Sequence, residues 1–152
     1  MVPVVGYQYH RVWSIPAELK CTLCREPFQD PVHIPCGNDC RTFCRPCIER
    51  HIRTHSSCPS CHKDHDRNDW IEPDSDLSEK LKQIPVQCSY CGVTNLTRGG
   101  FAAHYRDNCP RATVTCPAND VKCLWKGTRA DLDAHTINCS FQHIRRIVLQ
   151  ML

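Results

Sequence analysis

The sequence predicts several small α+β modules stabilised by bound metal, rather than one large hydrophobic core. Fourteen of the 152 residues are cysteines, a density typical of disulfide scaffolds or metal proteins. Only four Phe and three Trp are present, too few to fill a single core for a chain of this length. The N-terminal segment has no basic stretch followed by a long apolar run, so we expect no signal peptide. A reducing compartment, cytoplasmic or also nuclear, then favours metal-bound thiolates.

The charge balance and the lack of long apolar runs give little support for binding to nucleic acid or for crossing a membrane. The net charge of +3 comes from 19 basic and 16 acidic residues, too balanced to argue for nucleic acid by electrostatics alone. No stretch approaches about 18 consecutive apolar residues, so we expect no membrane span.

Cys-x-x-Cys turns divide most of the cysteines into close pairs, a spacing that offers two sulfurs to one ion. These turns lie at Cys21/Cys24, Cys44/Cys47, Cys58/Cys61 and Cys88/Cys91. Cys36 and Cys40 form one more pair in the first region. Because zinc usually takes four ligands as two pairs, the four pairs between Cys21 and Cys61 predict two zinc sites.

This region resembles a RING finger in the order of its pairs and in its supporting residues. The matching residues are the "DPV" that begins at Asp30, Pro35 and Gly37 around the third ligand, Phe43 before the fifth, and the closing "CPSC". In that family the pairs interleave as a cross-brace, so the resemblance implies two interleaved ligand sets. The sets are Cys21, Cys24, Cys44 and Cys47 for one ion, and Cys36, Cys40, Cys58 and Cys61 for the other.

The stretch "PCGNDCRTFCRPC" departs from the usual RING pattern. Most RING fingers read Cys-Gly-His there, and the histidine is the fourth ligand, whereas this sequence has Asn38. We expect Cys40 to replace that histidine. In the alternative, Cys40 is a free thiol and either His33 or His51 completes the site.

The second region repeats one ligand plan twice. It reads Cys88-x2-Cys91-x12-His104-x4-Cys109, then Cys116-x6-Cys123-x11-His135-x3-Cys139. Phe101 and Leu132 each precede the histidine by three residues, a helix position from which we expect them to pack on the metal loop.

The "CLWKGTRADLDAH" segment and the "CP" at Cys109 resemble TRAF-type zinc fingers. The resemblance implies a cross-brace RING followed by two tandem TRAF-type fingers in an elongated arrangement. Eight RING cysteines and six finger cysteines account for all 14, and the two histidines bring the total to sixteen ligands, hence four Zn²⁺ ions. No cysteine is then left for a covalent intermediate unless Cys40 is free.

We divide the chain into six segments on these grounds. They are a lead segment (1–17), the RING finger (18–66), a linker with a short helix (67–85), the first finger (86–110), the second finger (111–140) and a C-terminal helix (141–152).

Apolar spacing predicts three helices. One follows Cys47 as "CIERHIRTH". Another is "SDLSEKLKQI", capped by Ser75 or Asp76, with Leu77, Leu81 and Ile84 on one face, and ended by Pro85. In the last, Ile144, Ile147, Val148 and Met151 have helical spacing. This helix either packs on the last finger or begins an oligomerising coiled coil.

The RING resemblance implies a ubiquitin-protein ligase that holds a ubiquitin-charged conjugating enzyme, so that a substrate lysine attacks the thioester. Such a protein carries no catalytic residue of its own and acts by orientation. By position, the conjugating-enzyme face is formed by Leu23, Ile48, His51, Pro59 and His62. Conjugating enzyme, ubiquitin and a protein substrate or signalling partner are the expected partners, and the resemblance also allows a homodimer.

Two other functions compete with the ligase. A zinc-binding adaptor without ligase activity is suggested by His51, which stands where several active RING fingers carry a large apolar residue, and by His62, where many carry Arg or Lys. Nucleic-acid-binding fingers end in a histidine pair and carry a basic helix, whereas both fingers here end in Cys and the second helix, "ADLDAHTIN", is acidic to neutral. We therefore expect no nucleic-acid partner.

Overall fold

A computed structural model describes residues 6–36, 39–55, 57–64 and 70–150, without the side chains of residues 39, 40, 148 and 149. The chain divides into two compact units. One comprises Tyr9–Val86 with Thr97–Gly99, and the other Met1–Gln8, Gln87–Leu96 and Gly100–Leu152. Both are built from short strands and helices around Cys/His clusters, which confirms the predicted small α+β modules. Their elongated arrangement stays a prediction.

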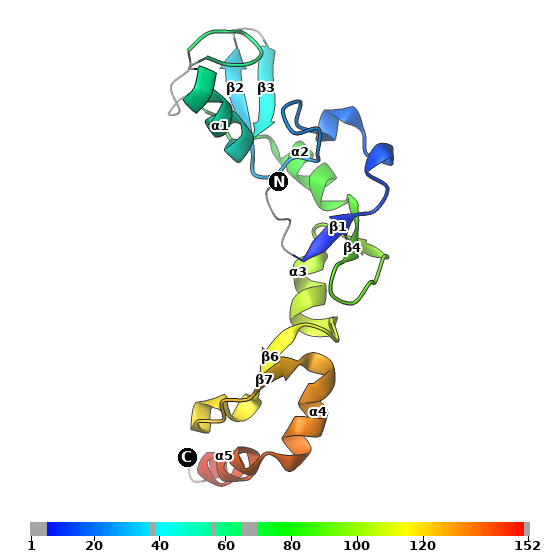
Figure 1. The fold of residues 1–152 in the computed structure, drawn as a ribbon, viewed down its shortest axis with the longest axis vertical. Helices are drawn as coiled ribbons and strands as arrows, with labels where there is room; N and C mark the ends of the chain where they lie inside the picture. Colours follow the sequence, from blue (N-terminus) through cyan, green and yellow to red (C-terminus); the bar gives the residue numbers. More distant parts are fainter. Residues whose placement is uncertain (1–5, 37–38, 56, 65–69, 151–152) are drawn as a thin grey trace. The chain divides into compact units, whose positions relative to one another are not determined.

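A hairpin and a helix form the centre of the first unit. Strand β2 (Pro31–Cys36) pairs antiparallel with β3 (Asp39–Cys44), and α1 (Arg45–His55) follows directly and lies beside the hairpin (Figure 1). Alternate residues of β2, Val32 and Ile34, are buried, as expected for a strand with one face on a core. The helix predicted as "CIERHIRTH" is confirmed: α1 ends at His55 as predicted and begins two residues earlier, at Arg45.

Helix α2 (Ser75–Lys82) packs on the same core through one apolar face. Leu81 and Ile84 are buried with the RING-like cysteines, and Leu77 packs against them. The predicted caps Ser75 and Asp76 are wrong: Asp74 is the N-cap, and its carboxylate accepts a hydrogen bond from the Leu77 amide at 2.9 Å.

The end of α2 also differs from the prediction. The helix stops at Lys82 rather than Ile84, and Pro85 begins strand β4 (Pro85–Cys88).

The segment before the first cysteine contributes to this core, although its sequence carries no recognisable motif. It contains β1 (Tyr7–Tyr9) and two 3₁₀ helices, η1 (Val12–Ser14) and η2 (Ala17–Leu19). Ile15 and Leu19 are buried among the core residues. The Tyr9 hydroxyl accepts a hydrogen bond from the Gln29 amide at 2.6 Å.

The second unit contains two similar strand-and-helix modules. After β4 come β5 (Leu96–Thr97), α3 (Phe101–Ala103), the π-helical turn η4 (His104–Asn108), β6 (Thr113–Thr115), η5 (Pro117–Val121), β7 (Lys126–Thr128), α4 (Arg129–Asn138) and α5 (Ser140–Gln150). Strands β6 and β7 pair antiparallel, and α4 follows β7 (Figure 1). None of the described helices is both long and apolar enough to cross a membrane.

Helix α5 packs against η5 of the second finger. Arg145 forms an ion pair with Asp120 at 2.8 Å, and the Gln142 side-chain amide donates to the Cys116 sulfur at 3.5 Å. These contacts confirm a terminal helix packed on the last finger. Ile144 and Ile147 are each 48% exposed, while Met151 and the Val148 side chain lie outside the described part of the chain. The coiled coil stays a prediction.

One arginine joins the two finger modules. The Arg129 guanidinium, at the start of α4, donates to the carbonyls of Cys109 (3.2 Å), Tyr105 (3.3 Å) and Arg106 at the end of the first finger. The Arg129 amide also donates to the Ala112 carbonyl at 2.9 Å. Carbonyls at a helix end lack intrahelical partners, so one side chain of the second finger caps the first.

We predict that Arg129→Lys lowers the free energy of unfolding of the second unit by about 1–3 kcal/mol, because one ammonium group cannot reach all three carbonyls. Denaturant unfolding of the zinc-loaded protein measures the change, followed by tryptophan fluorescence in a Trp13→Phe, Trp70→Phe background that leaves Trp125 as the reporter. Arg111→Lys is the matched control, since Arg111 is exposed. Equal stability of the two variants would contradict this role for Arg129.

Candidate metal centres

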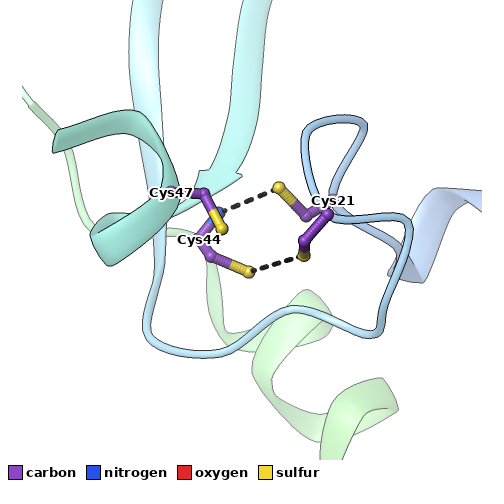
Figure 2. A group of neighbouring side chains, drawn as sticks. Cys21, Cys44 and Cys47 are labelled. Carbon is purple, nitrogen blue, oxygen red and sulfur yellow. Dashed lines mark hydrogen bonds between the residues drawn. The ribbon is translucent and has the colours of Figure 1, made fainter. Parts of the chain in front are cut away.

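Four sulfurs from distant parts of the chain converge in the first cluster. It contains Cys21, Cys24, Cys44 and Cys47, whose sulfurs all lie within 4.8 Å of one another. Figure 2 shows Cys21 on the loop before β2 facing Cys44 at the end of β3 and Cys47 in α1. The Cys24 and Cys44 sulfurs are 4.0 Å apart, and the Cys44 amide donates to the Cys21 sulfur at 3.4 Å. The hairpin therefore brings the first and third pairs together.

The second cluster contains Cys36, Cys58 and Cys61. The Cys36 sulfur at the end of β2 lies 3.5 Å from the Cys58 sulfur. The two clusters interleave along the chain, which is the cross-brace order. The Cys40 side chain lies outside the described residues, although its backbone pairs with Pro35, next to Cys36.

Neither histidine alternative for the fourth ligand joins this cluster among the described side chains. His33 Nδ1 is hydrogen bonded to the Thr42 hydroxyl at 2.7 Å, and the His51 ring stacks on His55.

Each finger module forms one cluster of three sulfurs and one imidazole. The first contains Cys88, Cys91, His104 and Cys109, and the second contains Cys116, Cys123, His135 and Cys139. His104 Nε2 lies 3.4 Å from the Cys91 sulfur, and His135 Nε2 lies 3.5 Å from the Cys123 sulfur. Both histidines therefore present Nε2 to their cluster.

These separations fit zinc. A tetrahedral ion with Zn–S bonds of about 2.3 Å holds neighbouring sulfurs about 3.8 Å apart, and a sulfur and an imidazole nitrogen slightly closer. The sulfur pairs at Cys36/Cys58, Cys88/Cys109 and Cys116/Cys139 are separated by 3.5, 3.9 and 3.9 Å. A disulfide would place its sulfurs at about 2.05 Å, and all the described cysteines are free. Tetrahedral sets of four cysteines, or of three cysteines and one histidine, are typical of structural zinc sites.

Three of the Cys-x-x-Cys turns share one backbone conformation. The residue after the second cysteine has a positive φ: 58° to 79° at Arg25, His62 and Gly92. Its amide donates to the carbonyl of the first cysteine at 2.7–2.9 Å. This closure tightens the turn enough for both sulfurs to face one ion. Only Gly92 adopts the left-handed region without a steric cost, so at Arg25 and His62 the turn is held by its surroundings.

The spacing between the histidine ligand and the last cysteine ligand differs between the two fingers, and the conformation of the helix end differs with it. Four residues separate His104 from Cys109, and the Cys109 amide donates to the His104 carbonyl at 2.7 Å, an i→i+5 bond of a π turn. Three residues separate His135 from Cys139, and that segment stays α-helical to Asn138. The π turn accommodates the extra residue of the first finger without moving the ligands apart.

Burial and hydrogen bonds shift the pKa values of the thiols in the first two clusters in different directions. A hydrogen bond with Cys44 lowers the pKa of Cys21 to about 5, and the same bond together with burial raises the pKa of Cys44. Burial and neighbouring thiols raise the pKa of Cys36 to about 12 and that of Cys47 to about 11. Metal binding must displace the thiol protons, so acid favours metal release.

Trp125 is a site residue that the sequence reasoning missed. Its ring stacks on His135 with centroids 4.4 Å apart and planes 8° apart. A Cβ atom at Gly127 would lie 2.5 Å from the Trp125 ring, so a glycine is needed there. The signal was present in "CLWKG", where a large aromatic residue and a glycine follow a ligand.

The core of the second finger contains Trp125 instead of the predicted Leu132. Val121 and Trp125 pack against its buried sulfurs, whereas Leu132 is half-buried but is not part of that group, so its predicted packing on the metal loop is wrong. Phe101 does pack on the first finger's core, as predicted.

The predicted conjugating-enzyme face is only partly at the surface. Leu23 is 36% exposed, His62 is exposed, and His51 and Pro59 are half-buried. Ile48 is fully buried, which makes its predicted contact with a partner wrong. Its position on α1 points toward the hairpin core with Val32 and Ile34, so it supports the face from inside.

Comparison with known proteins agrees with this geometry. Residues 79–135 match the family model described as "TRAF-type zinc finger". The chain thus combines a RING-like cysteine cross-brace with a TRAF-type zinc-finger region. The match begins within α2 and ends at His135, so it spans seven of the eight finger ligands.

The chain is also similar, at low sequence identity, to three curated proteins. The chain is 26% identical to "RING finger protein 151" of Mus musculus over 137 residues, covering 88% of this chain and 55% of that protein. It is 24% identical to "E3 ubiquitin-protein ligase PDZRN3" of Homo sapiens, covering 86% of this chain and 12% of that protein. It is 31% identical over 83 residues to "E3 ubiquitin-protein ligase TRIM69" of Mus musculus, covering 49% of this chain and 15% of that protein. The chain therefore spans about half, or much less, of the relatives it matches.

We predict that Trp125→Ala weakens zinc binding by the second finger by about 10- to 100-fold, because the ring orients a metal ligand from outside the coordination shell. Competition with a chromogenic chelator measures the affinity of each site in turn. Trp13→Ala is the control, since Trp13 is 82% exposed and lies in the other unit. An unchanged chelator profile for Trp125→Ala would exclude this positioning role.

Proposed function

We propose that the protein is a RING-type ubiquitin-protein ligase that binds a ubiquitin-charged conjugating enzyme and promotes ubiquitin transfer to a substrate lysine. The observation that carries the proposal is the interleaving of the two cysteine clusters in one unit. This interleaving anchors the Leu23 loop, the start of α1 and the Pro59 loop to shared metal sites. The relatives named as E3 ubiquitin-protein ligases add support.

The chemistry supports a scaffolding mechanism rather than a covalent one. Every cysteine whose side chain is described belongs to one of the clusters, which leaves no described thiol to carry ubiquitin. A closed four-ligand zinc site has no open coordination position for hydrolysis. The rate gain would come from holding the thioester and its donor ubiquitin in an attack-ready orientation.

The proposed conjugating-enzyme face consists of Leu23, His51, Pro59 and His62, with Ile48 beneath it. Leu23 supplies the apolar anchor, and His62 stands where a donor-ubiquitin contact is expected from the RING resemblance. We also propose four zinc ions in all, with Cys40 as the fourth ligand of the second RING site.

An adaptor without ligase activity is the second candidate. The burial of Ile48 favours it, because that burial leaves the face with one exposed aliphatic anchor and two histidines. Two arginines of the finger region make internal contacts: Arg98 donates to the Phe28 carbonyl at 2.5 Å, and Arg129 caps the first finger.

We predict that Cys40→Ser removes one zinc from four and destabilises the RING region, because three sulfurs cannot complete a structural site. Metal analysis of the purified protein measures the stoichiometry. Cys61→Ser is the reference variant that loses the same ion. Retention of all four zincs by Cys40→Ser would assign the fourth ligand to another residue.

We predict that the zinc-loaded protein accelerates discharge of ubiquitin from a charged conjugating enzyme to free lysine. Leu23→Ala should keep all the zinc and weaken the conjugating-enzyme contact by about 1–3 kcal/mol, as for an apolar anchor. Leu124→Ala is the matched control, since Leu124 is 88% exposed and lies in the other unit.

The assay separates the two candidate functions. Acceleration that Leu23→Ala reduces and Leu124→Ala leaves intact supports the ligase and its face. No acceleration across a panel of conjugating enzymes, from fully zinc-loaded protein, would favour the adaptor.

A further inference from the structure

Helix α1 carries a pair of histidines that belongs to none of the metal clusters. His51 and His55 are one helical turn apart, and their rings are stacked with centroids 4.4 Å apart and planes 11° apart. Side chains at i and i+4 lie on the same helix face. Two imidazoles in this relation can chelate one transition-metal ion.

The contacts of His55 are compatible with a proton on its Nδ1. This nitrogen lies 3.3 Å from the His51 carbonyl oxygen, which can only accept, and 2.7 Å from the Thr54 hydroxyl oxygen. The same hydroxyl lies 2.9 Å from the His51 carbonyl. When the hydroxyl donates to that carbonyl, Nδ1 donates to the hydroxyl oxygen and the lone pair of the ring is on Nε2.

This arrangement is the one that metal-binding histidines commonly show. A ligating imidazole usually donates its other ring N–H to a backbone carbonyl, a carboxylate or water, which fixes its orientation. His55 has that support before any metal is bound. In the described part of the chain, no side-chain hydrogen bond occupies the His51 ring, so this ring can rotate toward an ion.

The ring spacing is compatible with shared coordination. Two nitrogens on one tetrahedral zinc ion, with bonds of about 2.1 Å, lie about 3.4 Å apart. The rings are 4.4 Å apart at their centroids, and χ2 is a soft torsion in histidine, so the two rings can turn toward one ion.

We propose that His51 and His55 form a bidentate, exchangeable site for a divalent transition-metal ion such as zinc, nickel or copper. The site differs from the cysteine clusters because it offers two neutral nitrogen ligands at the surface and leaves the other coordination positions to water. It therefore binds more weakly than the structural sites and releases its ion without unfolding the protein.

The location gives the site a regulatory consequence, which rests on the proposed ligase function. His51 belongs to the proposed conjugating-enzyme face, so an ion with its waters on this residue would occupy part of that face. Free zinc beyond the amount that fills the structural sites would then compete with the conjugating enzyme.

Nickel titration of the zinc-loaded full chain tests the binding site directly. Ni²⁺ is paramagnetic, so histidine ring protons near the bound ion should broaden in the NMR spectrum. We expect broadening at His51 and His55 first, and binding about tenfold weaker or more in His55→Gln, because the second ligand of a chelate acts at high effective concentration. Thr54→Val, which removes the hydroxyl that holds His55, should weaken binding by a smaller factor.

His143→Gln is the matched control, because His143 is an exposed histidine on α5 with no histidine one turn away. Zinc content is measured at every nickel concentration. Broadening that spares His51 and His55, equal affinity in His55→Gln and His143→Gln, or binding only as structural zinc is lost would each overturn the proposed site.

Ubiquitin discharge with added zinc tests the consequence separately. Excess zinc should slow discharge by the parent protein and have a smaller effect on His55→Gln, whose basal rate should be retained because His55 lies outside the proposed face. Nickel binding without any discharge activity would reject the ligase but keep the metal site. Equal zinc inhibition of both proteins would reject the competition.

Discussion

The structure depends on gathering four soft donor atoms around one point from segments that are distant in sequence. Each unit has a modest apolar core, with Val32, Ile34, Phe43 and Ile48 at the centre of the first. Short strands and helices around such cores bury limited apolar surface. Zinc bound at the proposed sites would add free energy of folding, since structural zinc binding is folding free energy in small modules. The turns and helix ends described above keep the donor atoms of each cluster close to one another.

The backbone meets this constraint in several ways. Three Cys-x-x-Cys turns close through the same left-handed residue, at Arg25, His62 and Gly92, while the fourth pair is carried by the start of α1. The fingers place histidine and cysteine on one helix end, and a π turn absorbs the extra residue after His104. Arg129 then uses the exposed carbonyls of the first finger as acceptors, which makes the two fingers one structural unit. Coordination geometry is thus preserved while loop length and helix type vary.

The same constraint connects folding to the proposed function. The residues between paired ligands, such as Leu23 and Pro59, would have little freedom once their neighbours hold the proposed metal ions. A partner-binding face built on these loops is rigid before the partner arrives, which lowers the entropic cost of binding. The α1 helix contributes differently: Ile48 faces the core, and the next turn carries the half-buried His51 and the exposed His55. Metal chemistry therefore underlies the shape of the face and, through the histidine pair, its proposed regulation.

The sequence by itself determined which cysteines form close pairs, because these pairs have short spacings that a single turn enforces. The resemblance to RING fingers supplied the interleaving of the first four pairs, and Cys40 as a ligand stays a prediction. It also determined the small α+β architecture and the existence of helices α1, α2 and α5. Only the tertiary structure decided what neighbours each side chain meets. Ile48 is buried in the core instead of lying on the partner-binding face. Trp125, and not Leu132, packs on the buried cysteines of the second finger. Asp74, and not Ser75, is the N-cap of α2. Spacing along the chain is a local property, whereas burial, stacking and capping depend on how distant segments pack.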